Sequence, residues 1–275
     1  MTVADPEEKA LDARYVYALI PHTDRDNFGA IGIDGNAVYT ISYRDISAVV
    51  HDCPMEPYQG DEARVKEMVG THGDVVDAAW EEAGSILPMS FDVIVRSDDE
   101  RTADDNVRRW LADEYETLEA KLNELRDKVE LGVQIFWDTR GITQRIAEEN
   151  EEIKKLMDEM ATKSRGVAYF YQHKIADAVK KEMEAKADRD YRDYYRRLRA
   201  CAEDAEVNKI RRDKNRQMIF NLSLLVKRDE VTALGEELAK IKGEEGVEVR
   251  FTGPWAPYTF AAKIAAIGGE DGERR

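Results

Sequence analysis

Cysteine and histidine are scarce in this chain of 275 residues, and their positions exclude several kinds of chemistry. Cys53 and Cys201 lie far apart and form no C-x-x-C motif, so the sequence predicts neither a disulfide framework nor a redox pair. None of the histidines has the spacing of a metal ligand with another His or Cys. The four are His22, His51, His72 and His173. We therefore expect no metal site.

Motifs that bind phosphate or provide a nucleophile are also missing. Gly29, Gly32 and Gly35 follow the spacing G-x-x-G-x-x-G, which differs from both the dinucleotide and the P-loop patterns and is more typical of a turn-rich loop. His72 precedes Asp74 by two residues, but such a pair is expected by chance in an acidic chain. No G-x-S-x-G, H-E-x-x-H or S-x-x-K motif occurs. The sequence thus predicts a protein that is not an enzyme and binds no cofactor.

Long apolar runs are absent, and negative charge is in excess. No run of about 18 apolar residues occurs, and residues 1–10 are polar, so we expect neither a membrane span nor a signal peptide, and a cytoplasmic location. The 57 acidic and 41 basic residues give a formal net charge of −16, which disfavours contact with nucleic acid or anionic membranes. Such an excess also suits a salt-rich cytoplasm, and a halophilic origin is our hypothesis.

The pattern of the first half predicts an N-terminal α+β domain over residues 1–128. Residues 14–20 alternate as a buried strand, and the apolar runs 37–42 and 46–51 predict an antiparallel hairpin. Asp61 is placed to cap a helix over residues 61–83. Residues 85–95 return to strand character, and residues 98–128 carry the apolar spacing of one amphipathic helix.

The second half predicts another α+β domain, over residues 129–265. Strands are expected at 129–138, 218–226 and 246–251, with a helix at 229–242. Long helices over 139–205, interrupted around 163–166, predict a helical hairpin or coiled coil. This order suggests a modified ferredoxin-like fold with one crossover greatly lengthened. Residues 266–275 are polar and predict a disordered tail.

One segment departs from the negative charge. Residues 189–216 interleave arginines with tyrosines, as a strip that binds nucleic acid does. Alternatively, the tyrosines pack inward and the arginines meet acidic neighbours, which is the interpretation we favour because acidic residues are interspersed. Exposed arginines could then contact a protein partner. The candidates are Arg196, Arg197 and Arg199.

Four segments, taken in order, resemble the gas vesicle protein F/L family (GvpL/GvpF). They are residues 15–20 (YVYALI), 46–50 (ISAVV), 86–91 (ILPMSF) and 250–260 (RFTGPWAPYTF). The last is the most specific, because a Gly-Pro-Trp and a second proline with aromatics directly follow a strand. We expect it to form a rigid strap, with Trp255 packed on the second domain.

The resemblance implies an accessory protein that acts in gas vesicle assembly by binding the small shell protein GvpA and other accessory gas vesicle proteins. Length and long charged helices favour the L branch of the family. At Ser90 and Asp92 the chain departs from the family pattern, which has a basic residue and a glycine there. The seven signature residues that the resemblance implies are Pro88, Phe91, Gly253, Pro254, Trp255, Pro257 and Tyr258.

Two further expectations concern function. The long helices over 139–205 form an arm that binds partners, with the arginines named above on its surface. The alternative function is a nucleic-acid-binding regulator that uses the Arg/Tyr segment 189–216; an enzyme with an unrecognised carboxylate site is a third.

Overall fold

The computed structural model describes residues 13–210 and 216–267, which belong to two compact units. Of these residues, the first unit contains 13–130 and 254–267, and the second contains 131–210 and 216–253. The predicted boundary lies two residues before the observed one, but the C-terminal segment, which we had placed in the second domain, groups with the first unit. The final helix α8 (Tyr258–Ile267) covers the start of the predicted tail, whose remainder lies outside the described residues.

The first unit contains a six-stranded sheet in which β2, β3, β4, β1 and β5 are neighbours in that order and β6 also pairs with β1. Its strands are β1 (Ala13–Pro21), β2 (Asn27–Gly29), β3 (Val38–Tyr43), β4 (Ile46–Cys53), β5 (Leu87–Pro88) and β6 (Ile94–Arg96). The predicted hairpin is confirmed as the antiparallel pair β3 and β4. The strand β1 lies between β4 on one side and β5 and β6 on the other. Its sequence is a continuous apolar run because helices cover both faces of the sheet at this strand.

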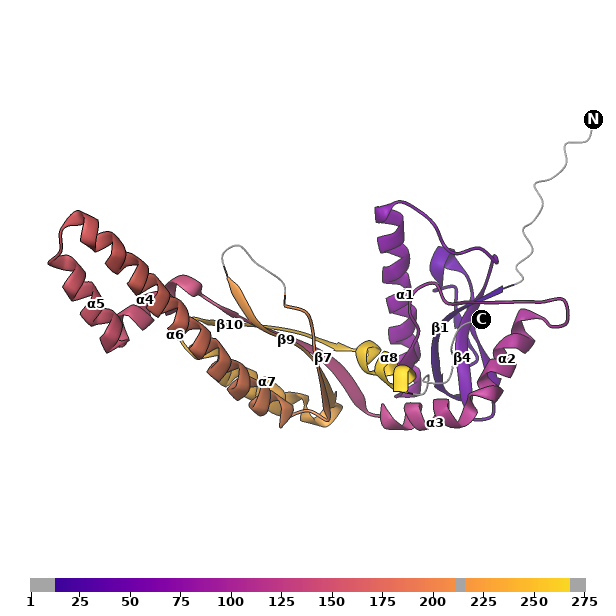
Figure 1. Cartoon of the computed structure of the whole chain (residues 1–275). Helices are drawn as coiled ribbons and strands as arrows, with labels where there is room; N and C mark the ends of the chain where they lie inside the picture. The colour runs from indigo at the N-terminus through magenta and orange to yellow at the C-terminus, as the bar shows by residue number, and fades with distance from the viewer. Residues whose placement is uncertain (1–12, 211–215, 268–275) are drawn as a thin grey trace, which may run out of the picture. The chain divides into compact units, whose positions relative to one another are not determined.

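Helices cover both faces of this sheet. They are α1 (Glu62–Ala83), α2 (Ala103–Asp113) and α3 (Tyr115–Glu124), with a 3-10 turn at Ile33–Gly35. Figure 1 shows α1 and α2 on opposite sides of β1 and β4. Successive residues of β1 reflect this, because the Tyr15 hydroxyl contacts His72 of α1 whereas Arg14 pairs with Asp104 of α2 at 2.7 Å. The predicted cap is confirmed, since the Asp61 side chain accepts a hydrogen bond from the Arg64 backbone at 2.9 Å.

Two predictions about individual segments are wrong. Residues 98–128 do not form one helix, because the backbone leaves the helical conformation at Glu114 (φ −104°, ψ 10°) and α2 and α3 are separate. The expected strap does not exist either. The strand β10 (Val247–Trp255) continues to Trp255, and α8, which we did not predict, begins three residues later.

The second unit has a four-stranded sheet in the order β10-β7-β9-β8. Its other strands are β7 (Lys128–Trp137), β8 (Asp204–Val207) and β9 (Gln217–Lys227). The helices are α4 (Thr139–Glu149), α5 (Glu151–Ala161), α6 (Arg165–Arg199) and α7 (Val231–Lys242), with a 3-10 turn at Arg228–Glu230. The end of the predicted helical region is strand β8 instead, because the Glu203 backbone donates to the Leu225 carbonyl at 2.8 Å and the chain joins the sheet.

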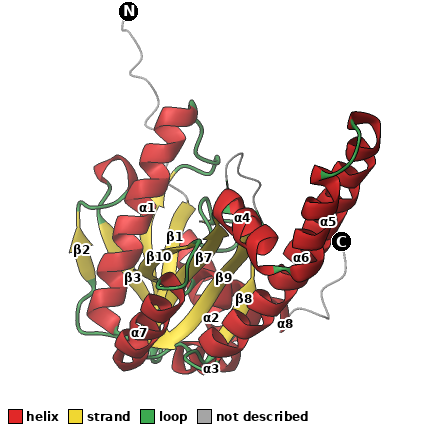
Figure 2. Cartoon of the chain, turned by 90° about the vertical axis from the view of Figure 1, so that its left-hand side faces the viewer, coloured by secondary structure: helices red, strands yellow, loops and turns green. Residues whose placement is uncertain are grey.

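A helical arm, residues 139–181, consists of α4, α5 and the first part of α6. Figure 2 shows α5 and α6 side by side. The predicted interruption is confirmed at residues 162–164, between α5 and α6. A second interruption was not predicted: the Asn150 side chain accepts hydrogen bonds from the backbone of Glu152 and Ile153, and this cap starts a new helix.

The remainder of α6 packs on the sheet through its tyrosines. The rings of Tyr191 and Tyr195 contact Phe220 of β9, with centroid distances of 5.2 and 6.5 Å. Tyr194 is buried, and its hydroxyl donates to Glu244 at 2.7 Å. The inward packing of the tyrosines, which we favoured over a nucleic-acid strip, is therefore confirmed.

Arg197 joins this part of α6 to α7. Its Nε lies 2.6 Å from a carboxylate oxygen of Glu237, and its Nη1 lies 3.1 Å from Asp193 and 3.0 Å from Glu244. The neighbouring Arg196 pairs with Asp193 on its own helix, and its side chain is 79% exposed. Adjacent arginines thus have different roles, since one connects two helices and the other lies mostly in solvent.

We expect Arg197→Ser to lower the free energy of unfolding by about 2 kcal/mol, because three carboxylates lose a charge-assisted partner. Arg196→Ser, the matched control, should change it by less than about 0.5 kcal/mol. Urea denaturation followed by circular dichroism measures both. Equal effects of the two substitutions would contradict the role given to Arg197.

Candidate functional site: an apolar pocket in the first unit

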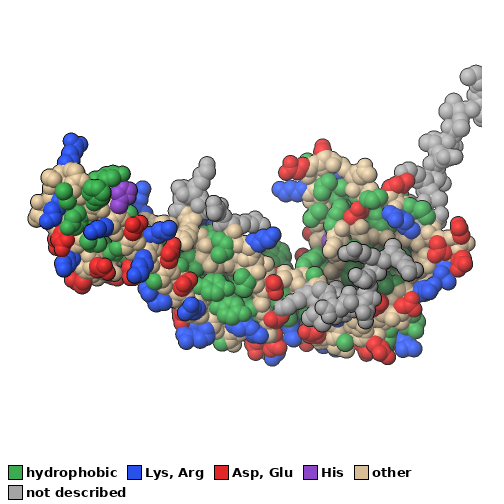
Figure 3. All heavy atoms as spheres, viewed as in Figure 1, with side chains coloured by type: hydrophobic (Ala, Val, Ile, Leu, Met, Phe, Trp, Pro, Cys, Tyr) green, Lys and Arg blue, Asp and Glu red, His purple; other side chains and the backbone are tan. Residues whose placement is uncertain are grey.

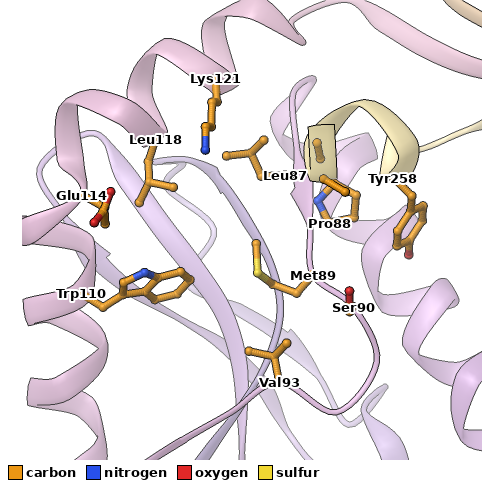
Figure 4. A pocket seen from close by; sticks show the side chains of 12 residues that line it. Leu87, Pro88, Met89, Ser90, Val93, Trp110, Glu114, Leu118, Lys121 and Tyr258 are labelled. Atoms are coloured by element: carbon orange, nitrogen blue, oxygen red, sulfur yellow. The ribbon is translucent and has the colours of Figure 1, made fainter. Parts of the chain in front are cut away.

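An apolar pocket of about 540 Å³ lies in the first unit, between β5 and the segment that follows it, the junction of α2 with α3, and α8. In Figure 4 the side chains of Trp110, Leu118 and Met89 point toward a common space. Its volume falls within the usual range of ligand sites. The lining residues are Leu87, Pro88, Met89, Ser90, Val93, Trp110, Glu114, Leu118, Lys121, Tyr258, Ala261 and Ala262.

The wall formed by residues 87–93 is held by His72 of α1. The Nε2 atom of His72 lies 3.1 Å from the Met89 carbonyl oxygen, and its Nδ1 atom lies 2.9 Å from the Tyr15 hydroxyl. Because a carbonyl can only accept, Nε2 carries the proton and Nδ1 accepts from Tyr15. The Tyr15 oxygen in turn accepts from the Asp92 backbone N–H at 3.1 Å. These bonds fix both ends of the segment 89–92.

A second wall of the pocket, α8, is held by a carboxylate. Glu130 is 8% exposed and accepts two hydrogen bonds from Thr259, one from its backbone N–H at 2.8 Å and one from its hydroxyl at 2.5 Å. A carboxylate at this position satisfies a free N–H of the first helical turn and interacts favourably with the helix dipole. The neighbouring side chains of Ala256 and Phe260 are buried. The position of Tyr258 at the pocket therefore depends on Glu130.

Two buried histidines, His51 and His72, lie beside Tyr15, behind the wall formed by residues 87–93, and remain neutral. Burial lowers the pKa of His51 to about 4 and also lowers the pKa of His72. The Nε2 atom of His51 lies 2.8 Å from the Tyr58 hydroxyl, and its ring stacks on Tyr15 at 5.0 Å. Both rings act as neutral hydrogen-bonding groups of the core. Within the described residues, no group of three or more His, Cys, Asp or Glu side chains could hold a metal ion.

Signature residues from two distant segments meet at the pocket. Pro88 comes from segment 86–91 and Tyr258 from segment 250–260, and both line it. Phe91 lies behind the wall, with its ring centroid 6.1 Å from those of Tyr15 and His72. Pro257 is buried next to Tyr258.

The remaining signature residues lie in β10. Gly253 has φ of 113°, a conformation that favours glycine, but it lies within the strand and not in a tight turn. Pro254 is exposed, and the Trp255 side chain is 52% exposed. The expectation that Trp255 packs as a buried side chain is therefore wrong, because Trp255 is the last residue of β10 and about half of its side chain is exposed.

The departure at Asp92 has a structural explanation. Asp92 has φ of 72°, in the left-handed region that glycine adopts freely and that aspartate tolerates better than most residues. Its side chain also accepts a hydrogen bond from the Tyr58 backbone at 3.1 Å. Aspartate can therefore occupy the position where the family pattern has glycine.

The three candidate arginines lie near the end of α6, within the predicted arm (139–205) but in the part of the helix that packs on the sheet of the second unit. Arg197 joins α6 to α7, and Arg199 donates to the Ala202 carbonyl at 2.5 Å. Arg196 keeps most of its side chain in solvent. The structure therefore does not bring them together as one surface for a partner.

Sequence reasoning missed most of the pocket. Trp110 and Leu118 were assigned to the buried stripe of a single helix, and nothing in the local pattern marks the break at Glu114. The segment 258–267 does carry a signal, because YTFAAKIAAI is rich in alanine and other helix-forming residues. That signal could have identified α8.

Comparisons with known proteins agree with this fold. The family model described as gas vesicle synthesis protein GvpL/GvpF matches residues 13–262. Gas vesicle protein L1 of Halobacterium salinarum is 30% identical, covering 96% of this chain and 95% of that protein. Gas vesicle protein L of Haloferax mediterranei is 25% identical, with coverage of 94% and 91%. The crystal structure of GvpF from Anabaena sp. PCC7120 superposes with a TM-score of 0.71 at 19% identity, covering 91% of this chain and 98% of that one.

The fold is thus the mixed helix-and-sheet fold of the GvpF crystal structures. The chain belongs to the gas vesicle synthesis protein GvpL/GvpF family, as the resemblance of its four segments predicted. Among residues 13–210 and 216–267, no helix is both long and apolar enough to cross a membrane.

Because the pKa values of the two buried histidines are lowered, we expect the folded protein to lose stability as the pH falls. An unfolded histidine titrates near pH 6.5, so between about pH 6.5 and the lower folded pKa the unfolded chain binds protons that the folded chain does not. Stability is therefore greatest above about pH 6.5, and as the pH drops through this range it should fall by about 1.4 kcal/mol per pH unit for each histidine, with no further loss below the folded pKa. Urea denaturation at pH 7 and pH 5 measures this slope. His51→Gln should make it shallower, and an unchanged slope would count against the assignment.

The backbone of residue 92 predicts an unusual order of variants. Asp92→Ala loses the bond to the Tyr58 backbone and keeps a β-carbon at positive φ, whereas Asp92→Gly loses the same bond but relieves the strain. We expect the glycine variant to be more stable than the alanine variant by about 1 kcal/mol, measured as the difference in unfolding free energy. The opposite order would show that residue 92 does not have this conformation.

Proposed function

We propose that this protein is an accessory protein that acts in gas vesicle assembly by binding the shell protein GvpA and other accessory gas vesicle proteins. Its membership of the GvpL/GvpF family supports the role in gas vesicles. We further propose that it is not an enzyme, that it works in the cytoplasm and at the vesicle, and that it belongs to the L branch, which the relatives named L support.

One observation carries the proposal that it binds partners at the first unit. Two segments of the family resemblance, 86–91 and 250–260, are far apart in the sequence but supply adjacent walls of one apolar pocket. A hydrophobic protein must be kept from aggregating before it assembles, and this requires an accessible apolar site on its escort. A pocket of about 540 Å³ lined by Trp110, Met89 and Leu118 can enclose an apolar anchor side chain.

The second unit supports a finer description of the fold. Its elements follow the order β-α-β-β-α-β, with the lengthened first crossover formed by α4, α5 and α6. Its strand order β10-β7-β9-β8 places the last strand beside the first, and the third beside the second. We infer a ferredoxin-like plan in which the arm is an extension of the first helix.

No observation favours the alternative of a nucleic-acid-binding regulator. The tyrosines of its proposed strip contact Phe220 or are buried, and Arg197 pairs with three carboxylates. Part of the strip, residues 211–215, lies outside the described residues.

A substitution that fills the pocket tests the proposal. Ala262 is an exposed residue of α8 that lines the pocket, so Ala262→Trp should occupy it without unfolding the unit. When the variant is purified from cells that make gas vesicles, we expect at least about tenfold less GvpA and accessory protein to co-purify with it. These cells should also contain fewer vesicles.

The matched control is Ala63→Trp, at an exposed alanine of α1 that does not line the pocket. It should retain partners as the unmodified protein does, with both variants showing an unchanged melting temperature. Full retention of every gas vesicle protein by the Ala262→Trp variant would refute the pocket as the binding site.

A further inference from the structure

The end of the helical arm differs in charge from the rest of the chain. Residues 160–181 contain five Lys or Arg and one acidic residue, a local charge of +4, in a chain with a formal net charge of −16. The stretch 160–176 contains no Asp or Glu at all. The five cations are Lys163, Arg165, Lys174, Lys180 and Lys181.

These cations are not neutralised by neighbouring carboxylates. Within the described part of the chain, four of the five form no ion pair, and Lys180 approaches Glu184 only at 4.0 Å. Near the other end of α6, by contrast, Arg197 meets three carboxylates and Lys186 pairs with Asp190 at 2.8 Å. The arm end therefore presents positive charge that remains available to a partner.

Large apolar side chains are exposed at the same end. Phe170 is 68% exposed and Tyr169 is 59% exposed, and Val167 and Met157 are each more than two-fifths exposed. Figure 3 shows hydrophobic side chains gathered at the end of the arm, beside Lys or Arg side chains. Large apolar side chains exposed in one region are typical of a site of protein contact.

A groove also lies at this end of the arm. A groove of about 450 Å³ runs between α5 and α6, with Met157 and Met160 on one side and Ile175 and Val179 on the other. Thr143 of α4 lies at its edge, and Lys180 lines it. Methionines adapt to the shape of a bound side chain, and a groove between two helices accepts the apolar face of a third.

We propose that the arm end, residues 160–181 together with Met157 of the groove, binds an amphipathic helix of a partner protein whose polar face is acidic. The apolar face of that helix lies in the groove between α5 and α6, and its carboxylates lie against the free cations. A flat lipid surface cannot enter the groove, and the charged backbone of a nucleic acid does not complement the apolar lining of the groove. The inference rests on the proposed role in assembly for the source of the partner, but not on the pocket of the first unit.

Two synthetic peptides of about 20 residues, long enough to form an amphipathic helix, test the proposal. They share the same Leu and Ile positions at helical spacing, and their polar positions are Glu in one and Lys in the other. We expect the acidic peptide to bind the purified full chain at least about tenfold more tightly than the basic peptide in calorimetry. Raising the salt concentration should weaken its binding.

Charge reversal at Lys163, Arg165 and Lys180 should weaken binding of the acidic peptide at least about tenfold, and Met157→Ser should do the same by removing an apolar side chain of the groove. The matched control reverses three exposed cations outside the arm end, Lys66, Arg189 and Lys242, and so changes the net charge equally. It should leave the affinity unchanged. Circular dichroism checks that all variants keep their helix content.

Several results would overturn the proposal. These are equal affinity for the two peptides, no binding of the acidic peptide, or loss of affinity in the control as large as in the arm variant. Binding of phosphatidylserine vesicles through the arm cations, without binding of the peptide, would assign the surface to a membrane. Self-association lost in the arm variant would assign it to a second copy. None of these results affects retention of GvpA by the pocket, so the two proposals fail separately.

Discussion

The buried carboxylate of Glu130 connects the two parts of the chain that form the first unit. The chain leaves this unit after Glu130 and returns at Pro254, and Glu130 itself accepts both hydrogen bonds from Thr259 at the start of α8. A long excursion costs little additional loop-closure entropy, so a few strong contacts at its ends are enough to fix the returning helix. Without Glu130 the first turn of α8 would lose its partner, and Tyr258 would no longer be held at the pocket.

The wall of the pocket formed by residues 87–93 depends on polar groups that are neutral. His72 links α1 to the Met89 carbonyl and to Tyr15, and Tyr15 accepts from the Asp92 backbone. In this series of hydrogen bonds each donor has an acceptor, and this is the condition under which buried polar groups stabilise a core. The pocket is therefore apolar inside, while the segments that form it are fixed by hydrogen bonds behind them.

Local patterns could be predicted, and contacts between distant segments could not. The cap at Asp61 and the hairpin of β3 and β4 depend on residues close in sequence, and both were predicted. The break at Glu114 and the exposure of Trp255 depend on the surrounding structure, and both were missed. The role of Arg197 was missed for the same reason, because Glu237 lies on another helix and sequence spacing does not show the two to be neighbours.

The central claim is that this protein acts by binding gas vesicle proteins. The most direct test replaces Tyr258, at the pocket, with a photo-reactive amino acid in cells that make gas vesicles. Lys66, an exposed residue of α1 that does not line the pocket, is the control position. Our account predicts light-dependent adducts with GvpA or another gas vesicle protein from position 258 and none from position 66. Folded protein that forms no adduct with any gas vesicle protein from position 258 would contradict it.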